Sequence, residues 1–132
     1  MDMQVIVDDT TAALTAVGFV TIQRALSLNA LPDLEDVPAV FYHPWKDAAL
    51  ADNDLTVGAH EQTVREQFCA VVVAREADID ARRKDVCNAL LGKKLTGRIW
   101  ATEYEQGEIL ALDEKLIWWR DVYATQVIWR NA

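Results

Sequence analysis

Cysteine and histidine are scarce in this chain of 132 residues, which holds two of each. A zinc site needs three or four Cys, His or acidic ligands at compatible spacing, and no CxxC, HExxH or HxH pattern occurs. Cys69 and Cys87 lie far apart in apolar surroundings, so we interpret them as buried free thiols. The sequence therefore predicts neither a metal nor a cofactor.

Catalytic motifs are missing as well. The chain has no GxxxxGK[ST] or GxGxxG phosphate loop and no GxSxG elbow, and Ser27 is its only serine. The stretch 52–54 (Asp-Asn-Asp) starts like a calcium loop, but Val57 stands where such a loop requires glycine. Pairs of acids such as Glu103 and Glu105 are expected in any chain this acidic. We predict that the protein is not an enzyme.

Long apolar runs and positive charge are also lacking. No stretch of about 18 apolar residues exists, which argues against a membrane span. The first eleven residues lack the charged and apolar regions of a secretory signal, so the expected compartment is the cytoplasm. With 13 basic against 21 acidic residues the formal net charge is −8, which argues against binding nucleic acid by neutralising its phosphates.

What the chain does have is apolar bulk at the spacing of strands. Its length suits one domain, residues 1–132, and 52% of its residues are hydrophobic. Residues 116–130 include three of the five tryptophans and carry large apolar groups on both faces. This composition favours a strand, bent near Arg120 and Asp121, over the helix that the same residues also allow. Because a small protein has little to cover both faces, we expect a second subunit to cover one.

The remaining segments predict two helices and further strands. The first helix has candidate caps at 8–10, with residues 5–7 as a possible earlier start, and ends at Gly18. The second lies within 76–94, with Asp78 or Asp80 as its cap and Gly92 at its end. Alternation predicts strands at three places, the last of them central because both its faces are apolar: 19–25, 39–43 and 64–75.

Prolines and polar stretches set the boundaries of these elements. Pro38 and Pro44 bound the second strand, and the polar residues 45–63 predict a long loop or an excursion with a marginal hairpin. After Gly107 the alternation of residues 109–113 predicts a further strand, and residues 113–115 predict the turn that joins it to the last strand in a C-terminal β-hairpin. The resulting fold class is α+β, with a largely antiparallel sheet and the two main helices packed on one side.

The candidate functional residues come from large apolar side chains that one small core cannot all bury, and not from a catalytic cluster. Exposed aromatic side chains mark protein interfaces, and the alternative is that these tryptophans belong to the core. We expect the last strand to meet a neighbouring subunit through Trp118, Trp119, Arg120, Asp121, Tyr123 and Trp129. In the long loop, the candidate residues of a flexible arm are Trp45, Asp54, His60 and Glu61.

Four stretches follow one another along nearly the whole chain: FVTIQRALSLNAL with PAVFYH, then FCAVVVAR, RRKDVCNALLGKK and GEILALDEKLIWWRDVY. Together, after an N-terminal helix, they resemble the tail terminator (minor tail, tail completion) proteins of long-tailed bacteriophages. The run of residues 118–121 before an aromatic is the most telling piece. That family shares a pattern more than identity, and the resemblance carries over no individual functional residue.

The resemblance implies a non-enzymatic tail assembly protein that forms a hexameric ring. Such a ring caps the tail tube, stops its polymerisation and presents a surface to the head connector, while DNA passes through the lumen without specific binding. The implied partners are other copies of the chain, the tube protein and the connector. Assembly would take place in the host cytoplasm, and the protein would then stay in the virion tail. Six copies would carry roughly −48 charges, which would repel DNA from the wall.

Two alternatives stay open. Another phage neck or head-closure protein would share the acidity and the ring. A small cytoplasmic ligand-binding α+β domain would instead have a pocket under the long loop, with site residues His43, Asp54, His60 and Glu61.

Overall fold

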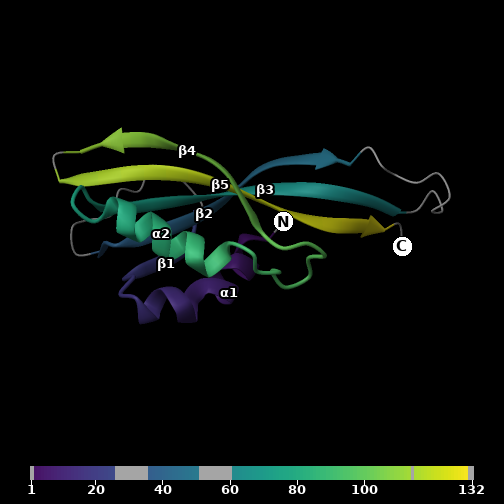
Figure 1. The fold of residues 1–132 in the computed structure, drawn as a ribbon, viewed down its shortest axis with the longest axis horizontal. Coiled ribbons are helices and arrows are strands. Elements are labelled where there is room, and N and C mark those ends of the chain that lie inside the picture. The colour runs from purple at the N-terminus through teal and green to yellow at the C-terminus, as the bar shows by residue number, and fades with distance from the viewer. Residues whose placement is uncertain (1, 26–35, 51–60, 114, 131–132) are drawn as a thin grey trace.

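Two helices and five strands make up the described part of the chain in this computed structural model (Figure 1). The structure describes residues 2–25, 36–50, 61–113 and 115–130, and of Arg130 only the backbone. The elements are α1 (Met3–Ala16), β1 (Thr21–Arg24), β2 (Ala39–Ala49), β3 (Glu61–Arg75), α2 (Ile79–Leu90), β4 (Glu103–Leu112) and β5 (Leu116–Arg130). The predicted α+β class is confirmed.

The strands form one sheet in the order β1-β2-β3-β5-β4. β1 runs parallel to β2, and every other neighbouring pair is antiparallel. β3 is central, as its two apolar faces predict, and it pairs with all of β5 from Glu61↔Arg130 to Arg75↔Leu116 without a register shift. β4 and β5 form the predicted C-terminal hairpin.

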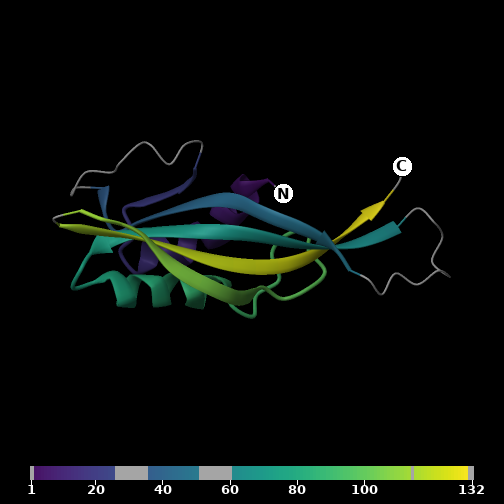
Figure 2. The same cartoon turned by 90° about the horizontal axis from the view of Figure 1, so that it is seen from above.

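Both helices cover the same face of the sheet (Figures 1 and 2). Side chains from both helices and from three strands share one buried cluster, which includes Ile6, Leu14, Tyr42, Phe68, Val72, Val86, Leu90 and Tyr123. A smaller cluster lies on the opposite face and consists of Ala39, Val71, Val73, Leu116 and Trp118. The prediction that the helices pack on one side is therefore confirmed.

The helix ends agree with the predicted glycine stops but not with all the predicted caps. α1 starts before residues 8–10, because the carboxylate of Asp2 accepts a hydrogen bond from the backbone of Gln4 at 2.9 Å. Gly18 follows α1 with φ 98°, a conformation that other residues rarely adopt. Asp78 precedes α2, but its side chain makes no capping hydrogen bond.

Of the two predictions for residues 45–63, the long loop is wrong at both ends, and the hairpin agrees with the antiparallel pairing of β2 with β3. β2 continues through Pro44 to Ala49, and β3 already begins at Glu61. A register shift between Pro44 and Asp47 accommodates the proline, which has no N–H to donate to a neighbouring strand. Because the bulge breaks the alternation and the residues are polar, the sequence pattern does not reveal this part of β2. Residues 51–60 lie outside the described residues.

β5 is one strand, so the helical alternative for residues 116–130 is wrong. Its pairing with β3 passes Arg120 and Asp121, the predicted bend, without interruption. The irregularities lie in β4, where the register shifts between Tyr104 and Gln106 and again after Ile109. β4 starts at Glu103 rather than after Gly107, so that glycine lies inside the strand.

Three strands extend past the helices as a ribbon that we call the arm, formed by residues 44–49, 61–65 and 126–130 (Figures 1 and 2). β1 ends at Arg24, opposite Tyr42, and β4 starts at Glu103, opposite Ala124, so neither outer strand accompanies the arm. The two helices lie toward the other end of the sheet. The arm therefore presents faces and edges that the described helices leave uncovered.

A buried hydrogen bond joins α1 to β2 and gives a test of this packing. Thr10 Oγ1 donates to the carbonyl of Ile6 at 2.7 Å and lies 2.9 Å from Tyr42 Oη, so the phenol donates to the threonine. Thr10→Val removes the acceptor of a fully buried phenol and should cost about 1–3 kcal/mol. Tyr42→Phe removes the donor itself and should cost about 1 kcal/mol or less. Urea unfolding followed by tryptophan fluorescence measures both, and the reverse order would contradict the assigned direction.

Candidate assembly surface

The arm exposes two large aromatic side chains. Trp129, near the end of β5, has 52% of its surface exposed, and Trp45, on β2, has 36%. Val127 and Ile128 beside Trp129 are only partly buried. Exposed aromatic and β-branched side chains on a projecting sheet are typical of surfaces that bind another protein.

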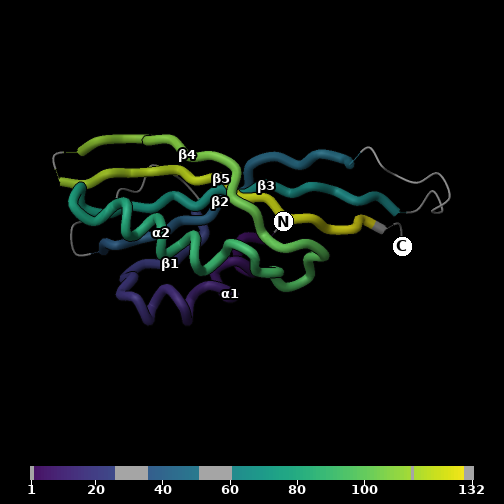
Figure 3. Tube along the Cα trace, viewed as in Figure 1, coloured from purple at the N-terminus to yellow at the C-terminus, as the bar shows by residue number. Residues whose placement is uncertain are grey.

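The loop after α2 adds a second exposed apolar group, formed by Leu91, Ile99 and Trp100. The backbone N–H of Ile99 donates to Gln126 O, and Thr125 Oγ1 donates to Trp100 O, each at 2.9 Å. These bonds hold the loop along β5 where the arm begins, before the chain turns into β4 (Figure 3). Trp100, in this loop, therefore lies beside β5, the strand that contains Trp129.

The six predicted interface residues have very different environments. Trp118 is buried with Val71 and Val73, and Tyr123 is buried against Phe68, whose ring centre lies 5.8 Å away. Of the other four, Asp121 is buried, Trp119 and Arg120 are partly buried, and Trp129 is exposed. Trp129 has the most surface to offer a neighbour. An interface role for any of the six stays a prediction.

Only some of the four residues predicted for a flexible arm, and of the residues of the alternative ligand site, lie in the described part of the chain. Trp45 lies in β2 and Glu61 is the first residue of β3, whereas Asp54 and His60 lie outside the described residues. His43 pairs with Cys69, eight residues along β3 from Glu61 and therefore about 26 Å away. His43 and Glu61 thus do not converge on one pocket.

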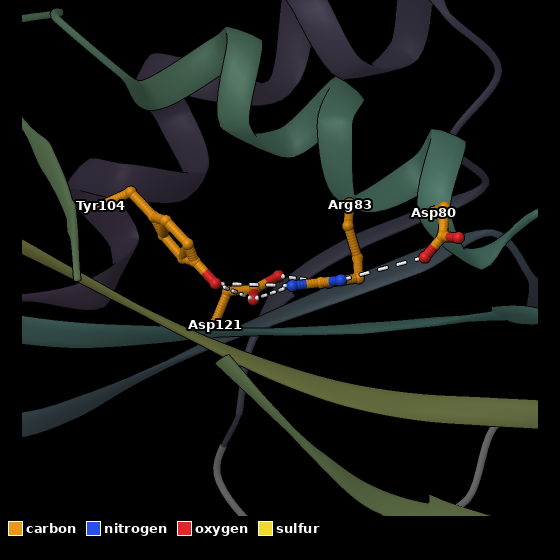
Figure 4. A network of polar contacts seen from close by, with 4 residues as sticks. All are labelled: Asp80, Arg83, Tyr104 and Asp121. Carbon is orange, nitrogen blue, oxygen red and sulfur yellow. Dashed lines mark hydrogen bonds and ion pairs between the residues drawn. The ribbon is translucent and has the colours of Figure 1, made fainter. Parts of the chain in front are cut away.

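A polar network at Asp121 joins α2, β4 and β5 (Figure 4). The Arg83 guanidinium donates from Nε to Oδ2 at 3.1 Å and from Nη2 to Oδ1 at 2.8 Å, which makes a two-pronged ion pair with a carboxylate only 2% exposed. The Tyr104 hydroxyl donates to the same Oδ1 at 3.1 Å. Asp80, one turn before Arg83, lies 3.9 Å from its guanidinium. We call Arg83, Tyr104 and Asp121 the Asp121 clamp.

The charges in the Asp121 clamp are already paired. The hydrogen bonds to Asp121 raise the pKa of Arg83, which keeps the guanidinium charged. Burial, followed by the negative charge of Asp121, raises the pKa of Tyr104, so its hydroxyl stays a neutral donor. The hydrogen bonds described for both groups go to Asp121 and to each other. The clamp fixes one helix and two strands relative to each other.

Gly107 is in β4 because the Asp121 clamp leaves no room for a side chain there. A Cβ at this position would lie 2.6 Å from Tyr104 Oη and 2.8 Å from Trp119 Nε1, and it would also collide with the Asp121 carboxylate. The Trp119 ring lies under the Arg83 guanidinium, 4.1 Å from ring centre to the central carbon. The glycine thus permits the close approach of two strands and their polar groups.

Sequence reasoning missed Arg83, Tyr104 and a second buried ion pair, Arg98 with Glu66. Arg98 Nε lies 2.8 Å from Glu66 Oε1, and their side chains are 13% and 3% exposed. This pair holds the loop after α2 onto β3. Two signals were available, a glycine inside a strand and an acid on an apolar strand face. Neither tells which distant residue supplies the partner.

On the helix-free face, Arg120 lies between an acid and an aromatic. Its Nη1 is 3.3 Å from Glu108, and its guanidinium is 4.9 Å from the centre of the Trp45 ring. His43 donates from Nδ1 to the carbonyl of Pro44 at 2.9 Å, and its buried Nε2 has no hydrogen-bond partner among the described residues. Burial and the charge of Arg120 lower the pKa of His43, against the opposing effect of the Pro44 carbonyl.

No described group of residues suggests chemistry at a metal or a nucleophile. Within residues 2–25, 36–50, 61–113 and 115–130, no cluster of three or more His, Cys, Asp or Glu side chains could hold a metal ion. Burial raises the pKa of Cys69 to about 12, so its thiol stays protonated. None of the described helices is long and apolar enough to cross a membrane.

Comparison with known proteins gives one family. A family model described as phage tail terminator protein matches residues 1–132. The chain belongs to the phage tail terminator family. The resemblance inferred from the four sequence stretches is thereby confirmed, and with it a structural role in a phage tail. No curated protein matches the chain.

The fold is also similar to solved structures, of which 26 chains match. One belongs to a structure described as the virion of a native gene transfer agent (GTA) particle. The two chains share 16% sequence identity and a TM-score of 0.60 over 92% of this chain and 90% of the other. At that identity the likeness shows the fold alone.

Gly107→Ala tests the Asp121 clamp. The new methyl group must displace the carboxylate or the phenol, so the unfolding free energy should fall by about 1–3 kcal/mol. In an Asp121→Ala background the carboxylate is gone and only the contacts with Tyr104 and Trp119 remain, so the same change should cost less, which a double-mutant cycle in urea measures. Additive effects of the two substitutions would show that Gly107 does not act through the clamp.

His43 predicts a component of stability that depends on pH. Because its pKa in the folded chain is lower than the usual 6.5, the unfolded chain takes up the proton first as the pH falls. Its contribution is therefore complete above pH 6.5 and decreases below that value. Between pH 7.5 and 5.5 the wild type should lose more unfolding free energy than His43→Gln, which has no titrating group there. If the unfolding free energies of the two proteins changed equally with pH, the assignment to His43 would be contradicted. Any contribution of His60 is the same in both proteins, because both contain it.

Proposed function

We propose that the protein assembles into a ring on the end of a phage tail tube, stops the tube from growing and offers a surface to the head connector. The observation that carries this proposal is the match of the tail terminator family to all of residues 1–132. Its partners would be other copies of the chain, with six as the expected number, the tube protein and the connector. The protein would assemble in the host cytoplasm and remain in the virion tail.

The arm supports an assembly of several copies. Its exposed aromatic residues, Trp45 and Trp129, lie beyond the helices that cover the rest of the sheet. A contact between two different patches of identical subunits closes into a ring when the rotation between them allows it. The arm of one copy resting on the body of the next is such a contact.

The two ends of the molecule also differ, as a cap requires. The arm lies at one end, and the β4–β5 hairpin lies at the other, with Leu112 72% exposed just before its turn (Figure 1). A subunit that adds to a tube and prevents further addition must present the tube with a fitting surface and solvent with a different one. The difference between arm and hairpin supplies two such surfaces.

Charge supports the passage of DNA without specific binding. A formal net charge of −8 per copy gives roughly −48 for a ring of six. Two basic residues near the arm are already matched, since Arg65 pairs with Glu105 and Arg98 pairs with Glu66. A lumen walled by such subunits repels phosphate groups, so DNA would slide rather than adhere.

Deleting the gene from the phage or prophage that carries it tests the ring-capping role. If the protein stops tube growth, electron micrographs of lysates should show tails that are longer and more variable than normal, with heads unattached. Supplying the wild-type protein from a plasmid should restore one tail length. Tails of normal, uniform length with unattached heads would instead assign the protein to the neck, which is the second candidate function.

A further inference from the structure

The arm has one strand edge with few of the usual protections against pairing. Exposed edges are templates for another strand, and proteins protect them with short strands, bulges, prolines and charges. Three of the four outer edges in the described part carry such features. They are β1, which has four residues; β4, with two register shifts and Glu103, Glu105 and Glu108; and the arm part of β2, with Pro44, a register shift and Lys46. The fourth edge, on β5 at residues 127–130, has no bulge, proline or acid, and Arg130 is its one charged residue.

The hydrogen-bonding groups on this edge can be assigned. Gln126 O accepts from the N–H of Ile99, which lies on the side of β5 where β4 pairs. Because backbone groups alternate along a strand, the N–H and C=O of Ile128 and Arg130 point to that same side, and those of Val127 and Trp129 point to β3. No described strand pairs with β5 on that side beyond Ala124. Two residues thus offer outward backbone donors and acceptors.

We propose that this edge pairs with the same edge of a second copy of the chain, antiparallel about a two-fold axis at Trp129. Pairing needs an accessible edge on both partners, and among the described edges this one has the fewest protective features. In this register the backbone of Ile128 exchanges hydrogen bonds with that of Arg130 of the partner subunit, and the reverse. Trp129 then lies opposite Trp129 of the partner subunit.

The neighbouring loop excludes the symmetric register centred on Ile128. Centring the pair on Ile128 would place Arg130 of the partner subunit against Gln126, where Ile99 already occupies the edge. Centring it on Trp129 avoids that position. Trp129 then occupies a non-hydrogen-bonded site, where opposite side chains approach most closely and aromatic pairs stabilise a sheet. This accounts for a tryptophan that is half exposed on the monomer.

Such a pair would be weak and closed. A contact of a few residues per copy falls well short of the roughly 1,200 Å² that stable protein interfaces bury. A two-fold contact uses the same patch on both copies, so it stops at two and does not propagate into a fibre. The inference concerns the free protein and does not rest on the proposed ring. In this form of the free protein, each of two copies covers the β5 edge of the other.

A cysteine at position 129 tests the pairing directly. At a non-hydrogen-bonded site the opposite Cβ atoms lie about 4.5–5.5 Å apart, close enough for a disulfide after a small adjustment. Under mild oxidation Trp129→Cys should give a linked dimer at a yield several-fold above that of Trp100→Cys, its matched control with the same 52% exposure. The wild type, with Cys69 buried and Cys87 partly buried, gives the background. Equal yields from the two variants, or a ladder beyond the dimer, would overturn the proposal.

A second measurement keeps Trp129 in place. Ile128→Pro removes an outward N–H that no described residue accepts, whereas Ile128→Ala keeps it and controls for the lost side chain. Sedimentation equilibrium over a range of concentrations should show a weak wild-type dimer, with Kd raised at least tenfold by Ile128→Pro and less by Ile128→Ala. Unfolding curves check that both variants remain folded. A strictly monomeric wild type would reject the pairing, while tail lengths after gene deletion would still test the ring.

Discussion

The pairing of β3 with β5 is the constraint on which the rest of this structure depends. Every residue of β3 has a partner in β5, and the ladder runs without a bulge from one end of the molecule to the other. Its central part is buried by two helices on one face and by the smaller cluster around Trp118 on the other. Because the ladder is longer than the helices that cover it, the arm follows as a direct consequence.

Two buried ion pairs keep the covered and uncovered parts of this ladder in place. The Asp121 clamp holds α2 and β4 against β5, and the Arg98–Glu66 pair holds the connecting loop against β3 where the arm begins. Such pairs add little net stability compared with apolar residues, but removing one partner leaves a buried charge and is costly. Their effect is to fix geometry, so that the arm leaves the body in a defined direction. An assembly protein needs that definition because its surfaces must fit several neighbours at once.

The sequence predicts most of the fold where its apolar alternation is strong. The central position of residues 64–75, the hairpin at 113–115 and the helix stops at Gly18 and Gly92 all follow from local chemistry. Prediction fails where tertiary pairing overrides the local pattern, as in residues 44–49, whose proline and charges do not prevent a strand from forming. The Asp121 clamp was beyond reach, because its partners come from α2 and β4 and only the fold brings them together. An exposed Trp129 and a buried Trp118 likewise look the same in the sequence.

The same ladder sets the order in which the chain can fold. The pair Arg75↔Leu116 joins residues close to the α2 and β4 segments, whereas Glu61↔Arg130 has the largest sequence separation of any pair in the ladder. Closing a longer loop costs more conformational entropy, and nonlocal strand pairing is intrinsically slow. The ladder therefore gains most by zipping from the hairpin end toward the arm. We expect the edge at Trp129 to form last, after the body of the subunit is complete.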